Sequence, residues 1–174
     1  MHSPLRLQKN KMKLPDLYTI GVYGSSQSEF FRKLTDNDID TFCDIRLRRA
    51  VRGSLYAFAN SQRLQSKLED LSIKYLHEMA LAPTTEIIKL QDKFDKEHKI
   101  QRRKREELTD VFKAAYKNKI LSKFNLEAFI KGLEKLGTKK MVLFCVEKSP
   151  NACHRSLVTN KIKELYPNMK VFNL

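Results

Sequence analysis

The stretch KMVLFCV, residues 140–146, is the most apolar strand candidate in the chain. An unbroken apolar run of this length is typical of a strand in a parallel sheet whose faces are both covered by helices. The run leads into Ser149-Pro150, where a residue that can cap a helix precedes a Pro suited to the first helical position. We therefore expect a buried central strand that is followed by a helix.

Shorter strand-like runs alternate with amphipathic helical stretches in the rest of the chain. Three of the helices have candidate caps, namely a capping box from Ser26 to Glu29, and single residues at Asn60 and Asn125. Such alternation indicates βαβ units. The sequence therefore predicts an α/β fold with a mainly parallel, Rossmann-like or flavodoxin-like sheet flanked by helices. The further strand candidates are residues 17–22, 40–45, 73–77 and 171–172.

The domain organisation follows from where this rhythm begins and where it is interrupted. The basic residues 1–16 lack an apolar middle, and we expect them to form a flexible leader. Residues 17–174 are expected to form a single α/β domain. Between about residues 84 and 124 the strand-helix alternation stops, and we expect a charged helical insertion there.

The charges of the insertion permit two interpretations. Residues 89–107 hold eight basic and five acidic side chains. In the first interpretation, the run Arg102-Arg103-Lys104-Arg105 contacts a phosphate backbone. In the second, the helix is merely solvated and carries opposite-charge pairs such as Asp92–Lys96 and Asp95–Lys99.

The composition limits the class of protein and its partners. The 174 residues include 34 Lys or Arg and 20 Asp or Glu, which gives a formal charge of +14, and the pI is near 9.7. Such a charge favours a phosphate-bearing partner, either a nucleotide or a nucleic acid. With 41% hydrophobic residues and only five Gly and five Pro, the chain is neither disordered nor fibrous.

No membrane partner is expected, because no apolar run approaches the roughly 20 residues that cross a bilayer. Three cysteines, without framework spacing or a secretory signal, predict reduced thiols and a cytoplasmic location. The sequence does not indicate an oligomeric state.

Candidate site residues follow the ends of the predicted strands, where open parallel sheets usually bind ligands. The loop Gly21–Ser26 precedes a capped helix, so Gly21 and Ser25 are candidates for binding an anion through backbone N–H groups. An ordinary tight turn is the alternative.

The second and third strand candidates add further polar residues. Asp44 and Arg46 point the same way, so they either pair with each other or act as a base and a phosphate ligand. Asn60, in a stretch with Tyr56 and Phe58, is a candidate for contacting a base. His77, at the end of the third strand, has either a binding or a structural role.

The densest cluster spans Cys145–Arg155. Cys145 and Glu147 alternate at a strand end, and Cys153-His154-Arg155 follows near a helix start. A thiol there is close to cations and a helix N-terminus, which favour the thiolate and nucleophilic catalysis. A redox pair between Cys145 and Cys153 is disfavoured, because the two cysteines lack the usual two-residue spacing. Alternatively, Cys145 is a buried core residue of the apolar strand.

A zinc site at this cluster needs four ligands in the usual structural motif, and Cys145, Cys153 and His154 supply three. We therefore predict neither a metal nor another cofactor. The residues available as a fourth ligand are Cys43, His77 and Glu147.

The chain resembles the domain of unknown function 488 family. The resemblance implies a compact α/β fold with the matching motifs on one side of a parallel sheet, but no established reaction. The first Gly is followed by Val22-Tyr23 where a His-Ser pair is common, and no Pro lies between Asp44 and Asn60. The matching blocks are residues 19–21, 44–46, 75–77, 143–148 and 153–157.

The leading functional hypothesis is a pocket that binds a phosphate-bearing nucleotide or nucleic acid and hydrolyses or transfers it. Arg46, Arg155 and the Gly21–Ser26 loop would hold phosphate. Asp44 or Glu147 would act as base or oxocarbenium stabiliser, and Cys153 or His154 as acid or nucleophile. The alternatives are a non-catalytic nucleic-acid-binding module and a thiol-dependent enzyme or redox sensor.

Overall fold

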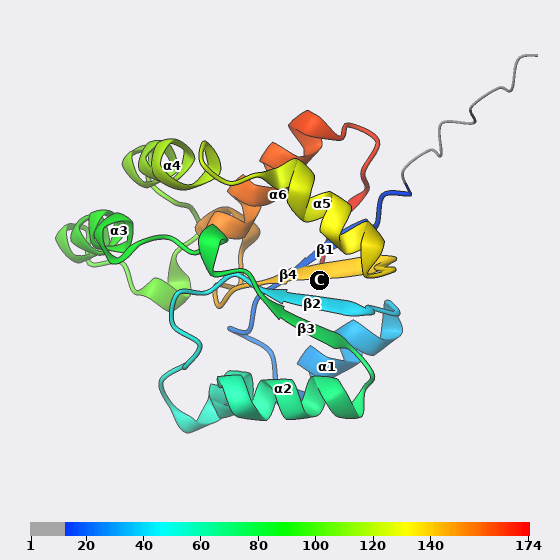
Figure 1. Ribbon diagram of the computed structural model, residues 1–174. Helices are drawn as coiled ribbons and strands as arrows, with labels where there is room; N and C mark the ends of the chain where they lie inside the picture. The colour runs from blue at the N-terminus through cyan, green and yellow to red at the C-terminus, as the bar shows by residue number, and fades with distance from the viewer. Residues whose placement is uncertain (1–12) are drawn as a thin grey trace, which may run out of the picture.

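The computed structural model describes residues 13–174 and contains one five-stranded sheet in which every pair of neighbouring strands is parallel (Figure 1). Its order is β3-β2-β4-β1-β5, which confirms the predicted α/β fold. Residues 1–12 of the expected leader lie outside the described residues, and the first strand begins one residue before its predicted start. The strands are β1 (Asp16–Ile20), β2 (Thr41–Asp44), β3 (Lys74–His77), β4 (Lys140–Phe144) and β5 (Val171–Asn173).

Strand β4 lies at the centre of the sheet, as its apolar sequence predicts. It pairs with β2 on one side and β1 on the other. Val142 and Phe144 pack into one face of the sheet, whereas Met141 and Leu143 pack into the opposite face. The strand therefore contributes to both halves of the core.

Helices cover both faces of the sheet (Figure 1). Helices α1 (Gln27–Asp36) and α2 (Ser61–Asp70) pack on one face, and α5 (Leu126–Lys135) and α6 (His154–Leu165) on the other. Along residues 13–174, no helix is both long enough and apolar enough to cross a membrane.

Two further helices, α3 (Thr85–Glu97) and α4 (Asp110–Tyr116), lie in the segment expected as an insertion and extend to one side of the sheet (Figure 1). A π-helix follows α4 directly at Lys117–Leu121. Short 3-10 turns complete the set at Ser54–Ala59, Met79–Leu81, Arg102–Lys104 and Pro150–Ala152.

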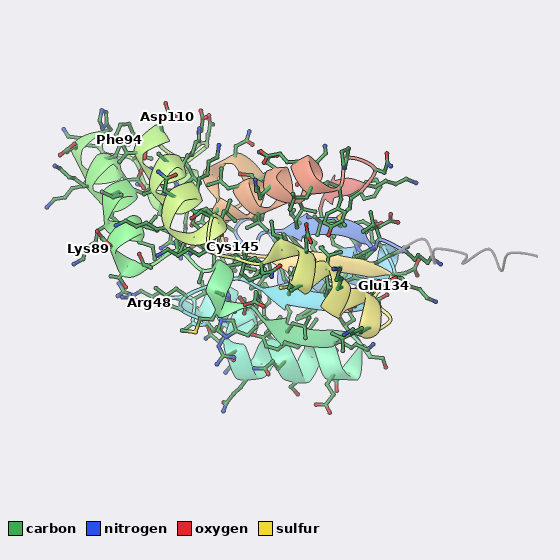
Figure 2. The ribbon with its side chains drawn as sticks, turned by 45° about the horizontal axis from the view of Figure 1, so that its top comes forward. Arg48, Lys89, Phe94, Asp110, Glu134 and Cys145 are labelled. Carbon is green, nitrogen blue, oxygen red and sulfur yellow. The ribbon has the colours of Figure 1, made fainter. Side chains whose placement is uncertain are left out.

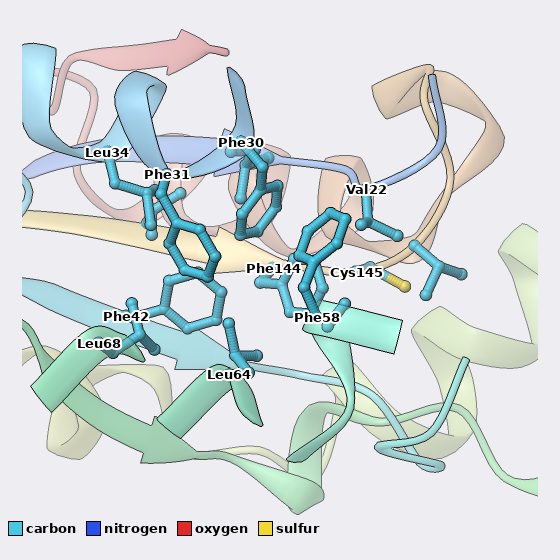
Figure 3. Packing of buried hydrophobic residues seen from close by; sticks show 14 of the residues in the cluster. Val22, Phe30, Phe31, Leu34, Phe42, Phe58, Leu64, Leu68, Phe144 and Cys145 are labelled. Carbon is cyan, nitrogen blue, oxygen red and sulfur yellow. The ribbon is translucent and has the colours of Figure 1, made fainter. Parts of the chain in front are cut away.

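An aromatic cluster fills the face beneath α1 and α2 (Figure 3). The ring centroids of Phe42 and Phe144 lie 5.0 Å apart, and that of Phe30 lies 5.5 Å from both Phe144 and Phe58. Replacing one such ring with Ala typically costs about 3–5 kcal/mol. Figure 3 shows Cys145 at the end of this cluster with its sulfur directed away from the rings.

Two helix caps form as predicted. The Ser26 hydroxyl accepts a hydrogen bond from the Glu29 N–H, and the Glu29 carboxylate accepts one from the Ser26 N–H at 2.8 Å. The Asn125 side chain accepts a hydrogen bond from the Ala128 N–H at 2.9 Å. These contacts satisfy donors that a helix start otherwise leaves without partners.

Two other caps differ from the prediction. Asn60 stands at the N-cap of α2, but its side chain accepts a hydrogen bond from the Val51 N–H at 2.6 Å instead of capping the helix. Ser149-Pro150 starts only a 3-10 turn, and α6 begins later, at His154. Cys153 is the N-cap of α6, so its thiol lies at a helix N-terminus.

The sheet order creates a crevice at the carboxyl ends of β2 and β4. After β2 the chain continues to the edge strand β3, whereas after β4 it continues to β5 at the opposite edge. The two loops therefore leave neighbouring strands in opposite directions. Ligands of open α/β sheets typically bind at such a point.

Gly21, just after β1, is required by the close approach of the loop after β4. A Cβ atom at this position would collide with the Glu147 carbonyl oxygen and would lie 3.3 Å from the Arg155 guanidinium. We expect Gly21→Ala to destabilise the fold by about 1–3 kcal/mol, the usual cost of forcing extra atoms into a packed region. Urea unfolding measures this change.

Gly132→Ala is the matched control for this substitution. Gly132 lies inside α5, and a Cβ atom there meets nothing within 4 Å. We expect it to leave the stability unchanged or to raise it by up to about 1 kcal/mol, since Ala favours helix more than Gly does. Equal effects of the two substitutions would contradict the close approach at Gly21.

Candidate active site

A pocket of about 650 Å³ occupies the crevice at the ends of β2 and β4. Its walls are formed by residues 46–48 and 50–52, by part of α3, and by residues 101–103 and 105, and its floor by residues 145–147 and 152–154. Figure 2 shows Arg48 and Lys89 at the same end of the molecule, with Cys145 further inside. The segments that follow β2 and β4 therefore line one cavity.

The floor of the pocket brings together Cys145, Glu147, Cys153 and His154. The Cys145 thiol donates to Glu147 Oε2 at 3.3 Å. His154 Nδ1 lies 3.8 Å from the Cys145 sulfur and 3.7 Å from the Cys153 sulfur. All four side chains are buried in the protein, so they interact in surroundings that water screens only weakly.

The orientation of His154 is set by a backbone carbonyl. Its Nε2 lies 3.0 Å from the Ile45 oxygen, which only accepts hydrogen bonds. Nε2 therefore carries a proton and donates it to Ile45, and Nδ1 is the nitrogen that faces the two thiols. Tyr116 packs against the imidazole, with its ring centroid 5.4 Å away.

The surroundings of the two thiols shift their pKa values in opposite directions. Burial opposes a thiolate at Cys153, but the neighbouring Cys145 thiol and the positive charges of His154 and Arg155 outweigh it and lower the Cys153 pKa. The Cys145 pKa is raised by the proximity of Cys153 and by burial. Burial disfavours the imidazolium of His154, yet the neighbouring Cys153 thiolate raises the His154 pKa.

Arginines from the insertion bind the Glu147 carboxylate. Arg102 Nε and Nη2 each lie 2.9 Å from Oε1, and Arg105 Nη2 donates to the same oxygen at 3.2 Å. Arg105 also pairs with Asp95 at 2.8 Å and donates to the Ala152 carbonyl. Of the predicted basic run, Arg105 is therefore buried, whereas Arg102 binds Glu147 and stays half exposed. The predicted Asp95–Lys99 pair is wrong because Asp95 binds Arg105.

Helix α3 contributes a buried polar face that the sequence analysis missed. Gln91 Nε2 donates to Asp95 at 2.8 Å, and Gln91 Oε1 accepts from the Thr109 N–H at 2.9 Å. The helix buries Ile87, Gln91 and Asp95, which recur every four residues. This spacing was the available indication that Asp95 lies on the inner face.

Asp44 and Arg46 form the ion pair that was one of the two predicted alternatives. The guanidinium donates to both carboxylate oxygens, at 2.9 and 2.7 Å. Tyr75 and the Arg46 N–H also donate to the carboxylate, and burial raises the pKa of Tyr75 to about 12, which keeps this donor protonated. These donors hold the buried Asp44 carboxylate in place beside Arg46.

Arg155 and His77 hold backbone segments of the site. The Arg155 guanidinium donates to the carbonyls of Glu147 and Lys148 at 2.7 and 2.9 Å. His77 Nε2 lies 2.9 Å from the Arg46 carbonyl, to which it donates. Neither side chain lines the pocket, so both position residues that do.

The Gly21–Ser26 loop does not present its backbone amides to the pocket. The N–H groups of Val22 and Tyr23 donate to the Val146 carbonyl, and that of Gly24 donates to the Tyr56 hydroxyl. The Ser25 N–H bonds within the loop. The predicted anion-binding role of this loop therefore gives way to an internal bonding role, and Ser25 lies outside the pocket.

The stretch expected to contact a base also has a different role. Tyr56 and Phe58 are buried in the core, and the Asn60 side chain is bonded to Val51. Phe58 packs against Phe30 and Phe31 of α1, and Tyr56 packs against Tyr23. Asn60 instead fixes the loop that forms a wall of the pocket.

The pocket carries excess positive charge. Seven basic side chains line it, against the two acidic side chains Asp92 and Glu147. Within residues 13–174, Arg48, Arg52 and Lys89 have no ion pair with a carboxylate. Arg103 stacks on Tyr23 and Tyr56 at 5.3 and 5.2 Å. The seven are Arg46, Arg48, Arg52, Lys89, Arg102, Arg103 and Arg105.

Comparison with known proteins gives one match. The model of a family described as "Domain of unknown function DUF488" matches residues 26–162, which include most of the pocket residues. No curated protein and no solved structure matches the chain.

Removing Arg105 tests the network beneath the pocket. We expect Arg105→Met to lower the free energy of unfolding by about 3–5 kcal/mol, because it leaves buried carboxylates of Asp95 and Glu147 without this partner. Lys104→Met is the control, since Lys104 is exposed and its loss changes stability by no more than about 0.5 kcal/mol. Similar unfolding midpoints for the two variants would contradict the network.

Proposed function

The chain belongs to the DUF488 family, and we propose that its pocket binds a phosphate-bearing nucleotide, free or as part of a nucleic acid, and hydrolyses or transfers it. The observation that carries the proposal is the charge of the pocket, in which basic residues outnumber acidic ones seven to two. Clustered cations repel one another, and a bound anion relieves that repulsion.

The cations of the pocket divide into paired and available groups. Arg46 pairs with Asp44, and Arg102 and Arg105 pair with buried carboxylates. Arg103 stacks on Tyr23 and Tyr56. Arg48, Arg52 and Lys89 remain for a ligand, and Arg48 and Arg52 belong to the same exposed loop. Guanidinium groups bind phosphate through two parallel hydrogen bonds. The greater negative charge of a phosphate monoester interacts more strongly with several unpaired cations than the single charge of a carboxylate does.

The size of the pocket favours a nucleotide over inorganic phosphate. A volume of about 650 Å³ lies within the roughly 300–1,000 Å³ range of sites for small organic ligands. The polar floor lies below the unpaired cations, so a phosphate held at the rim directs the rest of the ligand toward Glu147, Cys153 and His154. Hydrolysis or transfer at a phosphoester or glycosidic bond is compatible with these groups.

Substitution of the unpaired arginines tests binding. We expect Arg48→Gln/Arg52→Gln to weaken binding of ADP by at least about 10-fold, because charge-assisted hydrogen bonds contribute about 1.5–3 kcal/mol each. Calorimetry measures the Kd. Lys135→Gln is the control: it removes a charge from α5, at the end of the molecule where Figure 2 labels the neighbouring Glu134, and leaves binding unchanged.

A short single-stranded RNA serves as the second probe in the same assay. If the RNA binds but ADP does not, the pocket is no nucleotide site and a nucleic-acid-binding module is the better interpretation. If the double variant binds ADP as the wild type does, the pocket assignment is wrong.

Substitution of Glu147 tests turnover. The wild type is expected to release phosphate or free base from a nucleotide or RNA, and Glu147→Gln to lower kcat by about 10²–10⁴-fold while ADP still binds. The Gln oxygen still accepts from Arg102 and Arg105, so the fold is retained. NMR of the products measures the rate, and Glu134→Gln, far from the pocket (Figure 2), is the control. Absence of turnover by the wild type on all these substrates would contradict catalysis.

A further inference from the structure

The two cysteines and the histidine on the floor of the pocket form a set of metal donors. The sulfur atoms of Cys145 and Cys153 and a ring nitrogen of His154 all lie within 4.8 Å of one another, and all three residues are buried. They come from two segments, the end of β4 and the start of α6. Two thiols and an imidazole bind zinc in preference to hard cations, which favour oxygen ligands.

The spacing of the donors fits a tetrahedral zinc ion. Zinc binds sulfur at about 2.3 Å and imidazole nitrogen at about 2.0–2.1 Å, so the nitrogen-to-sulfur edge of a tetrahedron is about 3.5–3.6 Å. The corresponding distances in this protein are 3.8 Å for Cys145 and 3.7 Å for Cys153. The donors therefore stand close to their bound positions before an ion arrives.

The histidine is already oriented as a metal ligand. Its Nε2–H donates to the Ile45 carbonyl at 3.0 Å, which leaves the lone pair of Nδ1 directed toward the sulfurs. Ligating histidines almost always make such a second hydrogen bond, which fixes both the tautomer and the ring. Tyr116 restricts the ring further from one side.

We propose that Cys145, Cys153 and His154 bind one Zn²⁺, with the fourth coordination position directed into the pocket. Zinc binds both cysteines as thiolates and His154 as a neutral imidazole, so two protons are released to the solvent on metal binding: the proton of Cys145 and the proton that Cys153 and His154 Nδ1 share. In the metal-free protein the Cys145 thiol donates its proton in a hydrogen bond to Glu147 Oε2. Loss of this proton frees that carboxylate oxygen to accept a hydrogen bond from a water molecule on the metal.

The sequence predicted no metal because a structural zinc site needs four protein ligands. A catalytic zinc site uses three protein ligands and leaves a fourth position for water or substrate. All three donors line the pocket, so this site is of the second kind. The inference that zinc binds depends only on the three donors. A role for zinc as a Lewis acid near phosphate rests on the proposed function.

Metal content and spectroscopy of the full-length chain test the inference. The reduced protein is incubated with zinc, dialysed and analysed for metal, and a second sample is loaded with Co²⁺. We expect one zinc ion per chain, and for cobalt the thiolate charge-transfer and tetrahedral absorption bands. Cys145→Ser, Cys153→Ser and His154→Gln should each weaken zinc affinity by more than about 100-fold, beyond the effect of losing an outer partner.

Cys43→Ala and His98→Gln are the matched controls. Cys43 is a buried thiol in β2, and His98 caps the end of α3, so they remove the same residue types outside the cluster. Both should keep one zinc ion per chain. Retention of zinc by the three cluster variants, or failure of the folded wild type to bind zinc or to show the cobalt bands, would overturn the inference. ADP titration with and without zinc separates this failure from failure of the proposed function.

Discussion

The buried carboxylate of Glu147 constrains the rest of the pocket. It follows the central strand β4, and Oε1 accepts hydrogen bonds from Arg102 and Arg105, which come more than forty residues earlier in the chain. An unpaired buried carboxylate is costly, so the fold must bring a cation to this point. Arg102 and Arg105 meet this requirement, and their bonds to Glu147 hold the segment after α3 over the strand ends. This segment thereby becomes one wall of the pocket.

Ion pairs inside the protein also determine which cations of the pocket have no carboxylate partner. Asp44 neutralises Arg46, and Asp95 and Glu147 neutralise the inward-facing arginines. The cations left over lie at the rim, while the thiols, the imidazole and the carboxylate lie at the floor. The pocket thus places unpaired cations next to the thiols, the imidazole and the carboxylate, and the proposed chemistry on a phosphate-bearing substrate rests on this arrangement.

Much of the fold was predictable because it depends on local patterns. The apolar run of β4 predicts a strand buried on both faces, and the Ser26–Glu29 capping box predicts the start of α1. The start of α2 after Asn60 was predicted, but the bond of the Asn60 side chain to Val51 was not. The start of α6 was predicted too early, because Cys153 and not Ser149 is its N-cap. The partners of Glu147 and Asp95 were not predictable. Sequence spacing suggests ion pairs with residues three or four positions away on the same helix, whereas the arginines that bind these carboxylates come close only in the folded protein.

We propose that the pocket formed at the carboxyl ends of β2 and β4 and by the segment after α3 binds an oxyanion. A crystal structure of the protein soaked with tungstate, a phosphate-like anion with strong anomalous scattering, tests it most directly. The account predicts an anomalous peak beside Arg48, Arg52 or Lys89 and an intact pair between Arg105 and Glu147. Anion peaks only at other surfaces, or an insertion that leaves Glu147 without arginine partners, would contradict the account.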